Sequence, residues 1–205
     1  MTVGPTTRHE REIKTERLIL RAINPYEDAE DVHEWYTYAD ALKFTTRSPR
    51  ASLAETTTLL HQRNTSPIMY ALTIPRPPSV SPPSTSPPSR RKVIGLLGCK
   101  HFPEIGYSLN PAYQGQGYMT EALLAFLPVL FEAMPTAEQG GWDRALALVD
   151  EEHVASQRLL ERTGWERGGR LEGEYFSPVL GERRNAVEFW YSRPEVKGQR
   201  EEGGG

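Results

Sequence analysis

The order of apolar and polar segments predicts one α+β domain (α/β-like), built on a mixed sheet with helices packed against it. Strand-like and helix-like segments alternate through the second half of the chain, which is typical of this class. A length of 205 residues suits one domain better than two. Hydrophobic residues are only 38% of the chain, but the 17 prolines are unevenly spread, so the low average comes from particular segments.

The first half predicts two strands and two helices. The run RLILRAI at residues 17–23 is typical of a strand. Residues 26–38 predict a helix whose acidic start suits the positive end of the helix dipole. Residues 53–63 predict a second helix with Ser52 as its N-cap. A second strand follows at residues 68–74.

A Pro/Ser-rich stretch interrupts the chain between Pro75 and Lys92, where seven of 18 residues are proline and five are serine. Such a stretch buries too little apolar surface to fold, so we expect an exposed loop. It is either a linker between domains or the loop of a hairpin joining strands at 68–74 and 93–99. We favour the hairpin, because loop closure costs grow slowly with length and the preceding segment has too few strands for a domain.

The second half predicts four strands and two helices. Strands are expected at 104–109, 144–149, 165–171 and 186–192, and helices at 117–134 and 154–163. Pro128 should kink or divide the first of these helices, and Gly164 should end the second at its C′ position. The folded domain then spans 15–192 with the insert 75–92, between a disordered extension at 1–14 and a disordered tail at 193–205.

Charge and cysteine content exclude several classes. A formal net charge of −3 without a basic stripe argues against a nucleic-acid partner. No run of about 18 apolar residues and no apolar N-terminal leader are present, so we expect no membrane partner and no secretory signal. The lone Cys99 lies in an apolar strand-like run, which predicts a buried inert thiol and a cytoplasmic location.

The segment 110–122 (NPAYQGQGYMTEA) carries the clearest functional signal. Pro111 stops a strand, and Gly115 and Gly117 open a helix. The first N–H groups of a helix lack partners and attract anions, and glycine lets a ligand approach the backbone. A plain strand–turn–helix junction is the alternative. No P-loop lysine follows, and Thr120 stands where a dinucleotide fingerprint needs its third glycine.

This segment, together with Glu104–Tyr107, resembles the acetyl-CoA loop of the GNAT superfamily of N-acetyltransferases. More narrowly, it resembles the branch that contains the ribosomal-protein N-terminal (RimJ/RimL-like) acetyltransferases. Residues 15–21 (TERLILR) are similar to that branch's first strand, and 155–165 to its late helix and following strand. The resemblance implies a GNAT fold, with a mixed, mostly antiparallel, seven-stranded sheet, helices on both faces, and splayed fourth and fifth strands.

The same resemblance implies acetyl-CoA as cosubstrate, with no metal. The residues implied to bind it are Tyr107, Ser108 and Leu109 along the strand, Gln114, Gly115, Gln116, Gly117, Tyr118, Met119 and Thr120 in the loop, and His153 and Ser156. His153 stands where the family usually has Asn, and Ala112 where the wider superfamily often has Gln or Arg. Both departures bear on affinity for the cosubstrate.

Acetyl transfer to an amine requires a neutral amine, donors for the developing oxyanion and a proton or hydrogen bond for the departing thiolate. Glu104 stands where many superfamily members carry the general base, with an ordinary exposed carboxylate as the alternative. Ser156 stands where related enzymes place a hydroxyl near the coenzyme A sulfur, with a serine bonded to its own helix as the alternative. The remaining histidines show no metal-ligand spacing.

The resemblance implies that the acceptor binds between the two early helices and the loop joining the last two strands. Aromatic residues expected to line it are Trp35, Tyr36, Tyr175 and Phe176, although Trp35 suits the core better. The acceptor class stays open among a protein N-terminus, a polyamine, an aminoglycoside-like compound and another small amine. So does the oligomeric state, monomer or homodimer.

The sequence therefore predicts an acetyl-CoA-dependent N-acetyltransferase acting on a primary amine by direct attack in a ternary complex. The alternative is a catalytically weak acetyl-CoA-binding module for regulation or interaction. In that case the Pro/Ser insert would recruit a partner, because its proline pairs suit a polyproline-binding groove.

Overall fold

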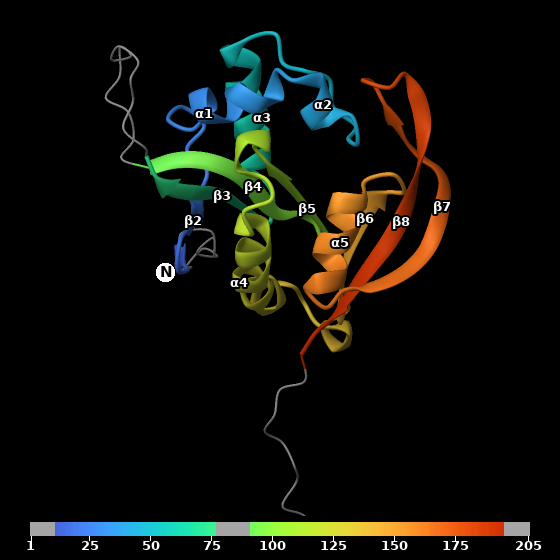
Figure 1. Ribbon diagram of the computed structural model, residues 1–205. Helices are drawn as coiled ribbons and strands as arrows, with labels where there is room; N and C mark the ends of the chain where they lie inside the picture. Colours follow the sequence, from blue (N-terminus) through green and yellow to red (C-terminus); the bar gives the residue numbers. More distant parts are fainter. Residues whose placement is uncertain (1–10, 77–90, 195–205) are drawn as a thin grey trace, which may run out of the picture.

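The computed structural model describes residues 11–76 and 91–194 and forms one sheet with helices on both faces (Figure 1). The strands are β1 (Ile13–Lys14), β2 (Ile19–Ala22), β3 (Ile68–Pro75), β4 (Arg91–His101), β5 (Glu104–Leu109), β6 (Arg144–Asp150), β7 (Glu166–Ser177) and β8 (Glu182–Ser192). The helices are α1 (Ala29–Tyr36), α2 (Ala39–Leu42), α3 (Leu53–Arg63), α4 (Tyr118–Ala133) and α5 (Val154–Arg162), with short 3-10 turns η2 (Pro111–Tyr113) and η3 (Ala137–Gln139).

The sheet has the order β1-β2-β3-β4-β5-β6-β8-β7, so it has eight strands among the described residues rather than seven. The additional strand is β1, whose Ile13 pairs with Leu20 of β2. It lies in the segment expected to be an extension, and two residues are too short to leave a periodic signal. All neighbours are antiparallel except β5 and β6, which confirms the predicted mixed, mostly antiparallel sheet.

The Pro/Ser-rich insert interrupts a hairpin and does not link two domains. Strands β3 and β4 pair antiparallel up to Pro75 and Arg91. The hairpin interpretation is therefore confirmed for the residues on either side of the insert, while residues 77–90 lie outside the described part of the chain.

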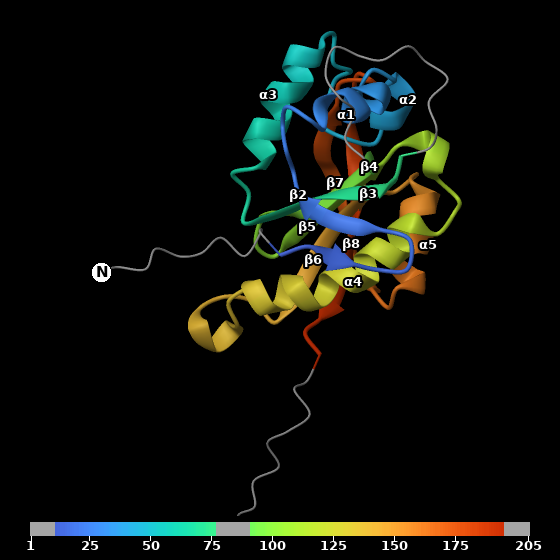
Figure 2. The same cartoon turned by 90° about the vertical axis from the view of Figure 1, so that its left-hand side faces the viewer.

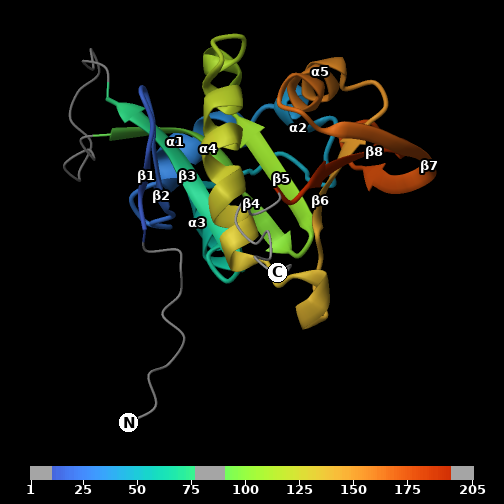
Figure 3. The same cartoon turned by 90° about the horizontal axis from the view of Figure 1, so that it is seen from below.

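The helices α1, α2 and α3 cover one face of the sheet, and α4 and α5 cover the other (Figures 2 and 3). Helix α3 has its predicted bounds, and Ser52 Oγ accepts a hydrogen bond from the Glu55 N–H at 3.3 Å. Helix α1 begins at Ala29, three residues later than expected, because Asn24 forms a turn with the N–H groups of Tyr26 and Glu27. The four-residue α2 was not expected at all.

Helix α4 is the one helical stretch in the described residues that is long and apolar enough to cross a membrane, measured over Tyr118–Gln139. Its apolar face, including Leu123, Phe126 and Leu130, is fully buried against the sheet, which accounts for this composition. The helix runs through Pro128 without dividing. Pro128 and Leu124 lie on its exposed side, where water can solvate the carbonyl group that the proline leaves without a partner.

Helix α5 ends where the sequence predicts, with Gly164 in the left-handed region at φ 88°. The last two strands are longer than expected and form a curved hairpin that rises beside α2 (Figure 1). This hairpin and α2 together close one end of the space over the sheet.

Candidate active site

Strands β5 and β6 separate soon after they meet. They run parallel, and within the described residues only Glu104 and Leu146 lie in register between them. On its other edge β5 pairs with β4 along its whole length, from Glu104 to Leu109. Half of the β5 backbone groups therefore point toward an opening where no strand pairs with them. This opening is the predicted splay between the fourth and fifth strands. Those two strands are β5 and β6 here, because β1 was not predicted.

A loop rich in free backbone donors follows β5. Asn110 Oδ1 accepts from the Ala112 N–H at 3.0 Å, which fixes the turn after the strand. Gly115 and Gly117 have φ of 73° and 80°, in the left-handed region that suits glycine. A Cβ added at Gly115 would meet nothing within 4 Å. The loop therefore presents its backbone to open space at the start of α4.

In the described structure the N–H groups from Gly115 to Thr120 donate to no loop or cap partner, and they precede or open α4. The Gln114 N–H differs, because it already donates to the Pro111 carbonyl at 3.2 Å. The array suits a phosphate or pyrophosphate at the positive end of the helix. Gln114, which the resemblance puts in the same array, therefore has its own N–H occupied within the loop.

Arg17 and Glu121 hold this loop against the N-terminal strand. Arg17 Nε donates to Glu121 Oε2 at 2.6 Å and Nη1 donates to the Gln116 carbonyl at 2.8 Å. The guanidinium also lies 4.6 Å from the centre of the Tyr118 ring. Burial acts to raise the pKa of Glu121, but hydrogen bonds from Thr15 and Arg17 outweigh it and lower the pKa. Arg17 thus adds a positive charge beside the candidate phosphate site.

Tyr107 and Ser156 meet on the α4–α5 face of the opening. The two hydroxyl oxygens lie 2.6 Å apart, and Ser156 is buried in the first turn of α5. Burial raises the pKa of Tyr107 to about 12, with the contact to Ser156 opposing it. Tyr107 therefore remains a protonated donor at neutral pH. The sequence pointed to both residues, but not to their contact.

His153 is the N-cap residue of α5 and is half-buried. Its ring stacks on Phe44, just beyond α2, with centroids 4.8 Å apart. Burial lowers the pKa of His153, and Lys43 lowers it further against the opposing charge of Asp150. His153 is therefore neutral at pH 7, and its ring joins α5 to the α2 region.

Glu104 lies at the start of β5, at the end where β5 and β6 still meet. Its carboxylate is 39% exposed and lies 3.8 Å from His101 Nε2. Three residues of strand span about 10 Å, so Glu104 is far from the Tyr107–Ser156 contact. Residues two apart share a face of a strand, which puts Glu104 with Gly106 and Ser108, opposite Tyr107.

The four candidate acceptor residues occupy different surroundings. Trp35 is buried between α1 and the sheet, so it packs in the core. Tyr36 is also fully buried, but its hydroxyl accepts from Arg63 Nη2 at 3.3 Å. Tyr175 is partly buried and bonds to Asp150, while Phe176 is 50% exposed on the β7–β8 hairpin.

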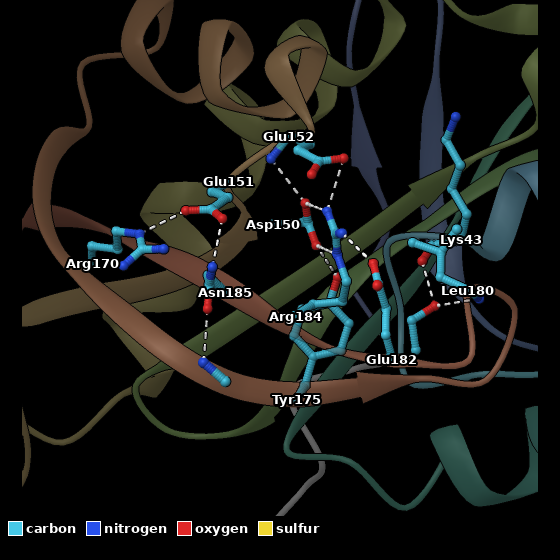
Figure 4. Close-up of polar contacts among 12 residues, drawn as sticks. Lys43, Asp150, Glu151, Glu152, Arg170, Tyr175, Leu180, Glu182, Arg184 and Asn185 are labelled. Atoms are coloured by element: carbon cyan, nitrogen blue, oxygen red, sulfur yellow. Dashed lines mark hydrogen bonds and ion pairs between the residues drawn. The ribbon is translucent and has the colours of Figure 1, made fainter.

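A buried ion pair anchors that hairpin to the carboxyl end of β6 (Figure 4). Arg184 donates to both oxygens of Asp150 at 3.0 Å, and the Tyr175 hydroxyl donates to Asp150 Oδ2 at 2.5 Å. Burial acts to raise the pKa of Asp150, but the bonds from Arg184, Tyr175 and the Glu152 N–H lower it. Burial and the Asp150 carboxylate together raise the pKa of Tyr175.

The tip of the hairpin is attached to α2. Ser177 is fully buried, and its hydroxyl donates to the Lys43 carbonyl at 2.6 Å while accepting from the Leu180 N–H at 3.3 Å. The hairpin therefore forms a fixed wall facing the early helices.

Sequence reasoning missed Arg17 and the Asp150–Arg184 pair as parts of the site. A signal existed for both, since Arg17 lies in the segment TERLILR and Asp150 directly follows an apolar strand. Long-range pairing such as Asp150 with Arg184 leaves no spacing pattern in one sequence. The buried Cys99 agrees with its prediction, and burial raises the pKa of its thiol to about 12.

Comparison with known proteins identifies the family. The acetyltransferase (GNAT) domain family matches residues 17–166, so the chain belongs to the GNAT acetyltransferase family. The uncharacterized N-acetyltransferase YnaD of Bacillus subtilis (strain 168) is 30% identical over 96 residues, covering 42% of this chain and 53% of YnaD. The chain thus matches about half the length of that curated relative.

Solved structures share the fold at low sequence identity. A GNAT-family acetyltransferase from Bacillus anthracis has a TM-score of 0.68 at 20% identity, covering 89% of this chain and 98% of its own. RimL, a ribosomal L7/L12 alpha-N-protein acetyltransferase solved with coenzyme A, has a TM-score of 0.65 at 20% identity, with coverage of 89% and 98%. The predicted GNAT fold is confirmed.

Proposed function

We propose that this chain is an acetyl-CoA-dependent N-acetyltransferase that acetylates a primary amine by direct attack within a ternary complex. The observation that carries the proposal is the loop Gly115–Thr120, whose free N–H groups lie at the end of a strand with an open edge. Acetyl-CoA supplies a pyrophosphate for the loop, an amide-bearing arm for the strand edge and a thioester for transfer.

The open edge of β5 and the loop suit two different parts of acetyl-CoA. Backbone groups of Tyr107, Ser108 and Leu109 that point away from β4 would bind the pantetheine amides as a neighbouring strand does. The N–H groups of Gly115–Thr120, with Arg17 beside them, would hold the pyrophosphate. His153, neutral and half-buried, would lie along the same arm.

Tyr107 and Ser156 form a hydrogen-bond relay for the departing thiolate. Either hydroxyl can donate in this contact. Because Tyr107 stays protonated, it can donate to Ser156, and the Ser156 proton is then free to point at the sulfur. A serine hydroxyl alone is a weak acid, so a donor behind it makes the hydrogen bond to the sulfur stronger.

Glu104 would take the amine proton through water. It shares the acceptor-facing side of β5 with Gly106, and a Cβ added at Gly106 would meet nothing within 4 Å. This open floor leaves room for an amine and water above the strand. The acceptor would enter between α1, α2 and the β7–β8 hairpin, where Tyr36 and Phe176 lie.

RimL is described as acting on a protein N-terminus, which keeps that class among the acceptors of this chain. We also infer a cytoplasmic location, since the buried Cys99 thiol suits a reducing compartment.

The test is release of coenzyme A, measured with a thiol reagent, on incubation with acetyl-CoA and a panel of peptides and small amines. Isotope-labelled acetyl-CoA and mass spectrometry then locate the new acetyl group. Amine-dependent release with an acetylated amine product supports the proposal. Tight binding of acetyl-CoA with no amine acetylated across the panel would favour the catalytically weak binding module.

A further inference from the structure

Three arginines gather on the acceptor side of the sheet without acidic partners. Arg47 and Arg50 lie in the segment between α2 and α3, and Arg63 ends α3. All three are half-buried. Within the described residues, no ion pair or hydrogen bond joins any of their guanidinium groups to a carboxylate, and Arg50 Nε and Arg63 Nε are buried without a partner.

Several other shielded basic groups in the described chain are paired with carboxylates. Arg21 meets Asp28 at 2.6 Å, Arg184 meets Asp150 at 3.0 Å, and Lys92 meets Glu34 at 2.6 Å. Shielded charges are costly unless they are paired. Arg47, Arg50 and Arg63, here called the arginine cluster, lack the acidic partner that these groups have, and a negatively charged ligand would supply one.

The arginine cluster borders Tyr36. Arg63 Nη2 donates to it at 3.3 Å, and the Arg50 N–H donates to the Tyr36 carbonyl at 2.7 Å. Burial acts to raise the pKa of Tyr36, but the charges of Arg63 and Arg47 outweigh it and lower the pKa. Burial lowers the pKa of Arg47, and Arg63 and Arg50 add to this effect. The cations thus lie close enough to repel one another.

The cluster lies against the open strand β5. The Ser108 hydroxyl influences the pKa of Tyr36, yet it is buried and completes no hydrogen bond. Arg63 also contacts Met69 Sδ at 3.7 Å, and Met69 pairs with Gly98, which in turn pairs with Gly106. The cationic groups therefore lie over the same face as the open floor at Gly106.

Distance along the strand limits the ligand's size. Ser108 lies two residues from Gly106, about 7 Å along β5, and adjoins Tyr107 in sequence. A group held at Ser108 and Arg63 is therefore within a short spacer of an amine above Gly106. Arg50 also borders a surface hollow of about 270 Å³, which lies along α3 and includes Glu55. The Glu55 carboxylate there accepts from the Ala51 N–H and does not pair with Arg50.

We propose that the acceptor amine carries an oxyanion, a carboxylate or a phosphate group, which binds among Tyr36, Arg47, Arg50, Arg63 and Ser108. This inference rests on the proposed acetyltransferase function and narrows its substrate class. Guanidinium groups bind both oxyanions with paired hydrogen bonds. Three unpaired cations repel a polyamine or an aminoglycoside, so those classes are disfavoured, and a peptide N-terminus qualifies when an acidic side chain follows closely.

Matched acceptor pairs test the proposal. Phosphoethanolamine is compared with ethanolamine, γ-aminobutyrate with n-butylamine, and a peptide beginning with Asp with one beginning with Asn, with spermidine added. In at least one pair the anionic member should have a kcat/KM about 10- to 100-fold higher, the range of charged hydrogen bonds. Arg47→Gln and Arg63→Gln should remove that preference. Arg162→Gln, at the exposed end of α5, is the matched control and should keep it.

Thermal unfolding gives a readout independent of turnover. With coenzyme A present to occupy the loop, inorganic phosphate or succinate should raise the Tm of the wild type and of Arg162→Gln. The same anion should raise the Tm of Arg47→Gln and of Arg63→Gln by a smaller amount. Without added anion, the two cluster variants should melt no lower than the wild type, since each loses a repelling charge.

The outcomes separate the two proposals. Equal kcat/KM for charged and neutral members, with Arg47→Gln and Arg63→Gln unchanged, would overturn the oxyanion site while leaving the acetyltransferase intact. An equal anion-induced shift in Tm in the wild type and both cluster variants would overturn it too. Failure of every amine to be acetylated, with the anion-induced shift still specific to the cluster, would overturn the proposed function and leave the site standing.

Discussion

The hydroxyl oxygens of Tyr107 on β5 and Ser156 on α5 lie 2.6 Å apart. They join the strand that borders the opening to the helix on its far side. Because Tyr107 is buried with a pKa of about 12, the pair stays fully protonated over the pH range in which enzymes are assayed.

Ser156→Ala should lower kcat by about 10- to 100-fold and leave the affinity for acetyl-CoA nearly unchanged, because the lost hydrogen bond matters as the thiolate departs. Tyr107→Phe should lower kcat less, since Ser156 retains its own proton. Steady-state kinetics with saturating amine measure both. If the Ser156→Ala enzyme had the wild-type kcat, the Tyr107–Ser156 relay would be excluded.

Glu104→Gln should lower kcat by about 100-fold and flatten the rise of rate with pH, because the amide cannot accept the amine proton. Binding of acetyl-CoA should not change, since Glu104 lies at the closed end of β5 and β6. The pH–rate profile measures this. A variant within twofold of the wild type at every pH would leave Glu104 an ordinary surface carboxylate.

Arg17→Gln should weaken acetyl-CoA binding about tenfold, because the loop loses its brace to Glu121 and the Gln116 carbonyl, and the pyrophosphate loses a nearby cation. Arg17→Lys keeps the charge but not the paired contacts, so its affinity for acetyl-CoA should lie between those of the wild type and Arg17→Gln. Titration calorimetry gives both dissociation constants. Wild-type affinity in Arg17→Gln would show that the loop holds its shape unaided.

Asp150→Asn should lower the free energy of unfolding by about 3 kcal/mol at pH 7, because Arg184 loses its buried partner. The native pKa of Asp150 is lowered, so its stabilising contribution is present above the ordinary carboxyl pKa of about 4. It is lost as pH falls through the lower native value.

Urea unfolding of the wild type and Asp150→Asn from pH 3 to pH 8 measures that contribution. The difference in stability should be constant above about pH 5 and shrink below about pH 4. Glu172→Gln is the control, because Glu172 is 82% exposed in its pair with Arg170 and should change stability by less than about 0.5 kcal/mol. Equal stability of Asp150→Asn and the wild type at pH 7 would contradict the account.

The sequence predicted the parts of the fold that local chemistry determines. Helix α3 follows from apolar spacing and the Ser52 cap, and the end of α5 follows from Gly164. Strand β1 and helix α2 were not predicted, because elements of two and four residues are too short to show a periodic pattern. The end of β7 and the start of β8 were not predicted, because the residues there are mostly polar and exposed.

The candidate site divides in the same way. The loop around Gly115 and Gly117 was predictable because one contiguous segment contains the strand end, the glycines and the helix start. The arginine cluster was not, since its residues come from separate segments and meet only when α3 packs over β3 and β4. The contact of Tyr107 with Ser156 joins residues 49 apart, a separation that a single sequence does not encode.

Acetyl-CoA binding at the loop is the central claim, and titration calorimetry of Gly115→Trp beside Gly140→Trp tests it most directly. Both glycines have left-handed backbones, with φ of 73° and 78°, and an added Cβ meets nothing within 4 Å at either one. They lie beyond opposite ends of α4, whose 16 residues span about 24 Å. Gly115→Trp should abolish acetyl-CoA binding while Gly140→Trp binds like the wild type, and equal affinity in all three proteins would contradict the assignment of the site.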